Sequence, residues 1–290
     1  MAYVTGTATS INDLLSAIQN ACTANGWTLS GSVLHKDGCY VDIHINGSLI
    51  SIKGGTGIDG SDNMTGVCDT HYGQFCIDSP RSGWFDRVNF SYPAEYFIHI
   101  NKNPDEVYVI VKWEIEYYQM LAFGQSAMPG LNGSGNWYLG TRNQRYYGIT
   151  DSGEDFGSRS TGFSLFCRGT HRDIESFGVD HGLDGQSKQW KVEGSWRDWR
   201  SLALRQPNRW NSESILQPVR VYVNRPSGFV SPVLECANAR FISVKNFDPE
   251  QVFSIGTDKW KVYPWIRKGP GGTYSNSSGY FGHAIRYDGP

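Results

Sequence analysis

Charged residues are scarce in this chain of 290 residues. Lys, Arg, Asp and Glu make up 19% of it, below the share of about a quarter that is usual. There are 26 basic and 28 acidic residues, so the net charge is −2. A near-neutral chain has no electrostatic attraction to nucleic acid or to an anionic membrane surface. We therefore expect no nucleic-acid partner.

Long apolar runs are missing too. No stretch approaches the roughly 18 consecutive apolar residues that a membrane-spanning helix needs, so we expect no membrane insertion. The beginning of the sequence, MAYVTGTATSINDLL, has neither the basic segment nor the apolar segment of a secretory signal peptide. We therefore expect the protein to be made in, and to fold in, a cytoplasm.

Motifs of common hydrolases are also absent. The sequence contains no G-x-S-x-G, no H-E-x-x-H and no G-x-x-x-x-G-K. Glu114 and Glu116 are too close together for the separated acid and base of a glycosidase, and a sharp turn between two strands explains them better. Asp180, His181 and Asp184 lie in a glycine-rich loop, where an Asp-His pair is commonplace. We expect no catalytic residues and no enzyme.

The cysteines have no regular spacing; they occupy positions 22, 39, 68, 76, 167 and 236. In a reducing cytoplasm they are expected to be buried thiols. Cys68, His71 and Cys76 have the spacing C-x2-H-x4-C and are the weak candidates for a metal site. Zinc takes four ligands, so a fourth would have to come from a distant residue such as Cys39 or His35. We expect neither a metal nor a cofactor.

Aromatic residues make up 14% of the chain, and there are 34 glycines. Both features are typical of a β-rich protein with many turns. Thr9 and Ser10 can cap a helix over about Ile11–Asn25, whose apolar residues form one stripe. The dipeptides Asp37-Gly38 and Asn46-Gly47 are strong hairpin signals. We predict a mostly β fold of antiparallel meanders, sandwich-like, with one N-terminal helix and long glycine-rich loops.

Further along the chain, strands are predicted over residues 96–100, 107–113 and 117–123 and near the C-terminus, with loops over 54–92 and 124–161. Two regions are expected. Residues 1–125 hold the helix and a β-meander, and residues 126–290 hold a loop-rich insertion and a C-terminal β region. The alternative is that both form one continuous domain.

Tryptophan and arginine cluster in WRDWRSLALRQPNRW, residues 196–210. Both residue types are enriched among interface hot spots, and both stack on sugars and bases. The stretch can anchor a helix to a sheet, form a protein interface, or bind a sugar or nucleic acid, and the near-neutral charge of the chain argues against nucleic acid. The candidate interface residues are Trp196, Arg197, Trp199, Arg200 and Trp210, together with Trp260 and Trp265 of the last two strands, which read as an edge pair.

Five segments along most of the chain carry a family pattern: TGTATSINDLLSAIQNACTANGWTL, LISIKGGTGIDGSD, YFIHINKNPDEVYVIVKWEIEYYQMLAFGQ, GSGNWYLGTR, and DKWKVYPWIRKG with SGYFGHAIRYDG. Together they resemble a family of tailed-bacteriophage virion proteins. The matching positions are structural residues and include no catalytic signature. Residues 162–215 have no counterpart in the pattern, and the six cysteines exceed what the family leads us to expect.

The resemblance implies a structural component of a tailed-phage virion, in the tail, baseplate or neck, that acts by protein–protein assembly. It implies other virion proteins and further copies of the chain as partners, and the virion, assembled in the host cytoplasm, as the location. Low charge and many aromatic residues suit a chain that buries wide surfaces against partners. The alternative is a host-surface glycan- or receptor-binding module of the tail, and a glycan-degrading enzyme is less favoured.

Overall fold

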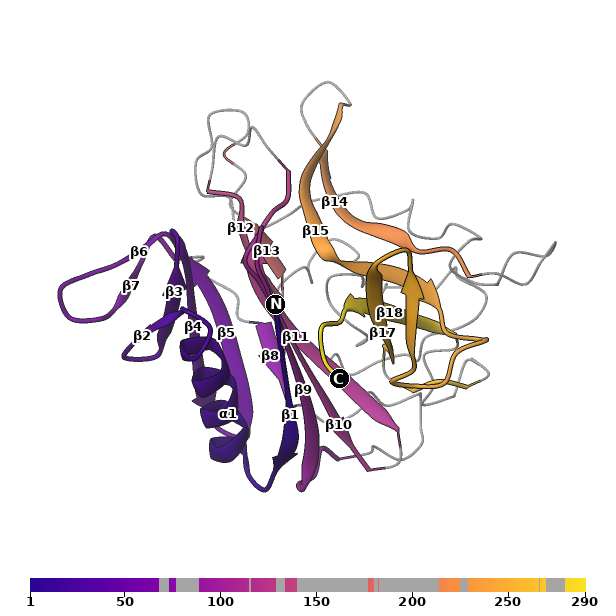
Figure 1. The fold of residues 1–290 in the computed structure, drawn as a ribbon. Helices are drawn as coiled ribbons and strands as arrows, with labels where there is room; N and C mark the ends of the chain where they lie inside the picture. Colours follow the sequence, from indigo (N-terminus) through magenta and orange to yellow (C-terminus); the bar gives the residue numbers. More distant parts are fainter. Residues whose placement is uncertain are drawn as a thin grey trace, which may run out of the picture.

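Figure 1 shows the fold in a computed structural model, which describes residues 1–67, 73–76, 89–114, 116–128, 134–139, 177–179, 182, 214–224, 229–265, 267–269 and 280–290. The described residues form one helix, and every strand among them runs antiparallel to its neighbours. The predicted fold class, mostly β with one N-terminal helix, is therefore confirmed. No helix in this part of the chain is long and apolar enough to span a membrane.

The helix α1 spans Ile11–Thr23, close to the predicted range. Ser10 is its N-cap: the backbone N–H of Asp13 donates to Ser10 Oγ, and the carboxylate of Asp13 accepts from the backbone N–H of Thr9. The first of these bonds satisfies an N–H group that the first helical turn leaves without a partner, and the second ties the residue before the cap to the helix. Gly26, with φ of 89°, carries the chain out of the helix in the left-handed conformation that glycine tolerates.

The N-terminal sheet has the order β2-β3-β4-β5-β8. Its strands are β2 (Thr28–Ser30), β3 (Val33–Lys36), β4 (Cys39–Asn46), β5 (Leu49–Gly55) and β8 (Gly73–Phe75), and a small flap follows β5, made of β6 (Gly57–Ile58) and β7 (Met64–Thr65). Asp37 and Gly38 have φ of 47° and 85°, as a two-residue type I′ hairpin loop requires. Both predicted hairpins are present.

The central sheet has the order β1-β9-β10-β11-β12-β13. Its strands are β1 (Ala2–Ala8), β9 (Ala94–Asn101), β10 (Glu106–Trp113), β11 (Tyr117–Gln125), β12 (Asn136–Leu139) and β13 (Phe177–Val179). The predicted strands at 96–100, 107–113 and 117–123 correspond to β9, β10 and β11. Strand β12 lies in the range 124–161 that was expected to be a loop, and with β13 it continues the central sheet beyond residue 125.

The C-terminal sheet has the order β14-β15-β18-β17-β16. Its strands are β14 (Gln217–Asn224), β15 (Val230–Ser243), β16 (Val252–Ile255), β17 (Asp258–Pro264) and β18 (Phe281–Arg286). The expectation that the last two strands form an edge pair is wrong. Strand β18 is inserted between β15 and β17, so both of its edges are hydrogen-bonded, and β16 is the edge strand instead.

The three sheets are stacked, with the central sheet in the middle (Figure 1). One of its faces packs with α1 and the N-terminal sheet, through residues such as Ile98 and Val109. The opposite face packs with the C-terminal sheet, through residues such as Tyr108 and Ile110. Because both faces are covered, apolar residues follow one another along β10 without alternation.

Candidate functional site

The seven candidate interface residues fall into two groups. Trp196, Arg197, Trp199, Arg200 and Trp210 lie outside the described residues. Trp260 and Trp265 are described, and they are buried, with 5% and 4% of their surface exposed. The expectation that these two rings face a partner is therefore corrected: they belong to the cores on either side of the C-terminal sheet. The guanidinium of Arg240 lies 5.0 Å from the centre of the Trp260 ring, and Trp265 stacks on His283.

The structure describes only one of the three candidate metal ligands. Cys68 and His71 lie outside the described residues. Cys76 is a buried free thiol whose pKa is raised by burial, so it resists becoming the thiolate that binds zinc. Within the described ranges, no group of three or more His, Cys, Asp or Glu side chains could hold a metal ion.

The two carboxylates considered for hydrolysis lie in a turn, as expected. Glu114 and Glu116 follow the end of β10 and precede β11, and their φ angles of 47° and 70° are left-handed. Trp113 and Tyr117 are the last paired residues on either side of this turn. Asp180, His181 and Asp184 lie outside the described residues.

A serine, a histidine and an aspartate, not singled out from the sequence, align on the N-terminal sheet. His44 Nδ1 lies 3.1 Å from Asp42 Oδ1, and Ser51 is the direct cross-strand partner of His44. A hydrolase of the Ser-His-Asp type also needs the serine hydroxyl hydrogen-bonded to the histidine. Ser51 Oγ is buried without a hydrogen-bond partner among the described residues, so the contact that would activate it is not made. The alignment therefore does not form a catalytic unit.

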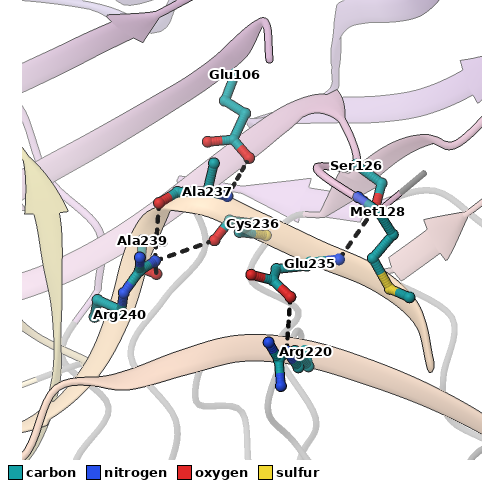
Figure 2. Close-up of polar contacts among 9 residues, drawn as sticks. All are labelled: Glu106, Ser126, Met128, Arg220, Glu235, Cys236, Ala237, Ala239 and Arg240. Atoms are coloured by element: carbon teal, nitrogen blue, oxygen red, sulfur yellow. Dashed lines mark hydrogen bonds and ion pairs between the residues drawn. The ribbon is translucent and has the colours of Figure 1, made fainter. Parts of the chain in front are cut away.

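A buried polar cluster centres on Glu106, the first residue of β10, which is fully buried. Its carboxylate accepts hydrogen bonds from the backbone N–H of Ala237 at 2.8 Å and of Asn238 at 2.9 Å. It also accepts from Asn238 Nδ2 at 2.7 Å and from the Tyr108 hydroxyl at 3.1 Å. We call this group of four residues the carboxylate clamp. It joins the central sheet to the C-terminal sheet (Figure 2).

The clamp exists because β15 bulges at this point. Val219 of β14 pairs with Cys236, but the preceding residue, Pro218, pairs with Arg240. Residues 237–239 therefore have no partner in β14, and although Ala239 pairs with Ile285 of β18, residues 237 and 238 pair with no described strand. Glu106 accepts two of the N–H groups, and Arg240 Nη1 donates to the carbonyl oxygens of residues 236, 237 and 239.

Two opposing effects act on the acidity of Glu106. Burial raises the pKa of this carboxyl to about 7, because a charge is poorly solvated in the interior. The hydrogen bonds from Asn238 and Ala237 act in the other direction, since they stabilise the charged form. Neither effect was visible in the sequence, where Glu106 is one acid at the start of an apolar strand.

A second buried network joins the central sheet to the last strands. His99 Nδ1 lies 3.2 Å from the carbonyl oxygen of Arg286, which can only accept, so Nδ1 carries the proton. Nε2 then accepts from the Tyr263 hydroxyl at 2.9 Å. Burial lowers the pKa of His99 to about 3, so the ring is neutral. Beside it, the ammonium of Lys261 donates to the Tyr3 hydroxyl at 2.8 Å and lies over three aromatic rings.

Large apolar side chains are exposed at the two extremities of the C-terminal sheet. Phe229, at the outer end of the long β14–β15 ribbon, is 67% exposed. At the opposite edge, Val252 and Ile255 of β16 are 40% and 55% exposed. Single exposed apolar residues are ordinary, but here two of them lie on an edge strand. The buried polar clusters therefore join the layers, whereas Val252 and Ile255 are exposed at the open edge.

No protein-family model and no curated protein sequence matches this chain.

Proposed function

We propose that this chain is a structural component of a tailed-phage virion, in the tail, baseplate or neck, that acts by protein–protein assembly and not as an enzyme. The observation that carries assembly is the exposure of Phe229, Val252 and Ile255 at the extremities of the C-terminal sheet. An edge strand with exposed apolar side chains risks unwanted pairing in a solitary protein, and a partner that covers it removes that risk.

The virion as the setting is supported by the family pattern in the sequence. Its segments include the N-terminal helix, the strands β9 to β11 and the closing strands β17 and β18, which are the framework of the three layers. The carboxylate clamp and the His99 network fit this role, because they connect layers that must keep their relative position when neighbouring subunits attach. The proposed partners are other virion proteins and further copies of the chain.

Purified particles test this function. Particles of the phage that encodes the chain are isolated by density gradient, and the chain is quantified against the major capsid protein by mass spectrometry. We expect a fixed copy number. A chain that is abundant in infected cells but absent from purified particles would contradict the proposal.

Two variants refine the test. Phe229→Ser removes the exposed ring from the ribbon and should lower incorporation into particles, whereas Phe229→Leu keeps an apolar side chain and should be incorporated normally. Particles that assemble fully without the chain but fail to adsorb to the host would instead favour the receptor-binding alternative.

A further inference from the structure

Strand β16 is the open edge of the C-terminal sheet. It pairs with β17 on one side, and no described strand pairs with it on the other. Its sequence, Val-Phe-Ser-Ile, has no charge and no proline, which are the usual devices that block pairing at an edge. Three of its four side chains are exposed, and Phe253 is half-buried against Phe247. The edge is therefore accessible and chemically suited to another strand.

The hairpin geometry shows which backbone groups point outward. Ile255 and Asp258 close a two-residue loop, so they exchange hydrogen bonds, and hydrogen-bonded and non-bonded pairs alternate from there. Phe253 and Trp260 are then the next hydrogen-bonded pair. Val252 and Ser254, which lie between these positions, direct their N–H and C=O groups away from β17.

We propose that β16 pairs antiparallel with β16 of a second copy of this chain, about a two-fold axis that passes beside Phe253. The inference rests on the proposed assembly function and names the partner. In this register, Val252 faces Ser254 of the second copy and Ser254 faces Val252. Both pairs exchange their outward N–H and C=O groups, which gives four hydrogen bonds and one continuous sheet through both copies.

The same register also suits the side chains. The two copies of Phe253 lie opposite each other on one face, flanked by Ile255 of each copy, so these four apolar side chains come together. A two-fold axis perpendicular to the sheet makes the two strands antiparallel and gives both copies the same contacts.

Sedimentation velocity over a wide concentration range tests the association. We expect the wild-type chain to shift from monomer to dimer as its concentration rises. Ser254→Pro removes an outward N–H while leaving the β17 bonds intact, so it should abolish the dimer. Ser254→Ala keeps that N–H and is the matched control, which should dimerise like wild type. A wild-type chain that stays monomeric, or a proline variant that dimerises normally, would overturn the inference.

Disulfide trapping tests the register with two exposed positions whose substitution does not disturb the core. In the proposed pairing the Cα atoms of residues 252 and 254 of opposite copies are about 5.5 Å apart, within the range of a disulfide. An oxidised mixture of Val252→Cys and Ser254→Cys chains should therefore form a mixed dimer. Either variant alone should not, because identical positions lie roughly 7–8 Å apart diagonally. Equal trapping in all three samples, or none beyond the wild-type background, contradicts the register.

The two proposals fail separately. A chain present in particles at fixed copy number, but monomeric and untrapped, retains the virion function and loses the β16 pairing. A chain that dimerises in the trapped register, but is absent from particles, retains the pairing and loses the virion function.

Discussion

Glu106→Gln tests whether the carboxylate clamp holds a proton near neutral pH. Glutamine has nearly the same size and fills the same space beside Ala237 and Asn238, but it does not ionise. Burial raises the pKa of Glu106 from 4.5 to about 7, although the hydrogen bonds from Asn238 and Ala237 oppose this rise. The pH dependence of stability shows which effect prevails.

The sign of the effect follows from proton binding. Between pH 4.5 and about 7 the folded protein keeps the Glu106 proton, whereas the unfolded chain has lost it. The free energy of unfolding therefore falls as the pH rises through this window, and it is constant with respect to this group above the window. One pKa unit corresponds to about 1.4 kcal/mol, so the full shift is worth roughly 3 kcal/mol.

The assay is urea unfolding of the wild type and of Glu106→Gln at a series of pH values from 4.5 to 8. Subtracting the two unfolding free energies removes the titration of all groups that both proteins share. We expect the wild-type value minus the variant value to fall by roughly 2–3 kcal/mol between pH 4.5 and pH 8. A constant difference, or one that grows with pH, would refute the raised pKa and show that the four donors keep the carboxylate charged.

Three further substitutions probe the same interior by urea unfolding at pH 8. Arg240→Lys replaces the guanidinium that donates to three carbonyl oxygens of the bulge, and should cost about 1–3 kcal/mol; no loss would mean that these carbonyls need no such donor. Tyr263→Phe removes the donor to buried His99 Nε2 and should cost about 1–3 kcal/mol, and an unchanged midpoint would contradict this. Gly124→Ala would place a Cβ 2.3 Å from the backbone oxygen of Asp105, so the variant should be destabilised by about 1–3 kcal/mol; a wild-type midpoint would show that the strands can separate there.

Signals confined to a few neighbouring residues could be read from the sequence. The helix was predicted from its cap at Ser10 and its apolar stripe, and the Asp37-Gly38 turn from backbone preferences alone. The second hairpin shows the limit of such signals. Asn46-Gly47 marks a turn, but the loop residues are Gly47 and Ser48, which moves the pairing by two positions. Apolar residues face the core in either register, so the pattern does not distinguish them.

The features that depend on distant segments were not predicted. The carboxylate clamp joins residues more than a hundred positions apart in the sequence. No local sequence pattern indicates the bulge at residues 237–239. Trp260 and Trp265 were expected to anchor an edge pair formed by the last two strands of the chain. The insertion of β18 between β15 and β17 buries both rings, and that order of strands is a property of the whole sheet.

The groups that hold this chain together are distinct from the exposed groups that we propose to contact other chains. Buried polar groups such as Glu106 and His99 connect one sheet to the next, so their loss lowers the stability of the monomer. Exposed apolar groups such as Ile255 contribute little to the folded monomer, since water already surrounds much of their surface. Substitutions of the buried polar groups should therefore lower the free energy of unfolding without weakening association of the protein that remains folded. Substitutions of the exposed apolar groups should weaken association without lowering the free energy of unfolding. An assembly subunit needs this separation, because its body has to be stable both before and after its edge is covered.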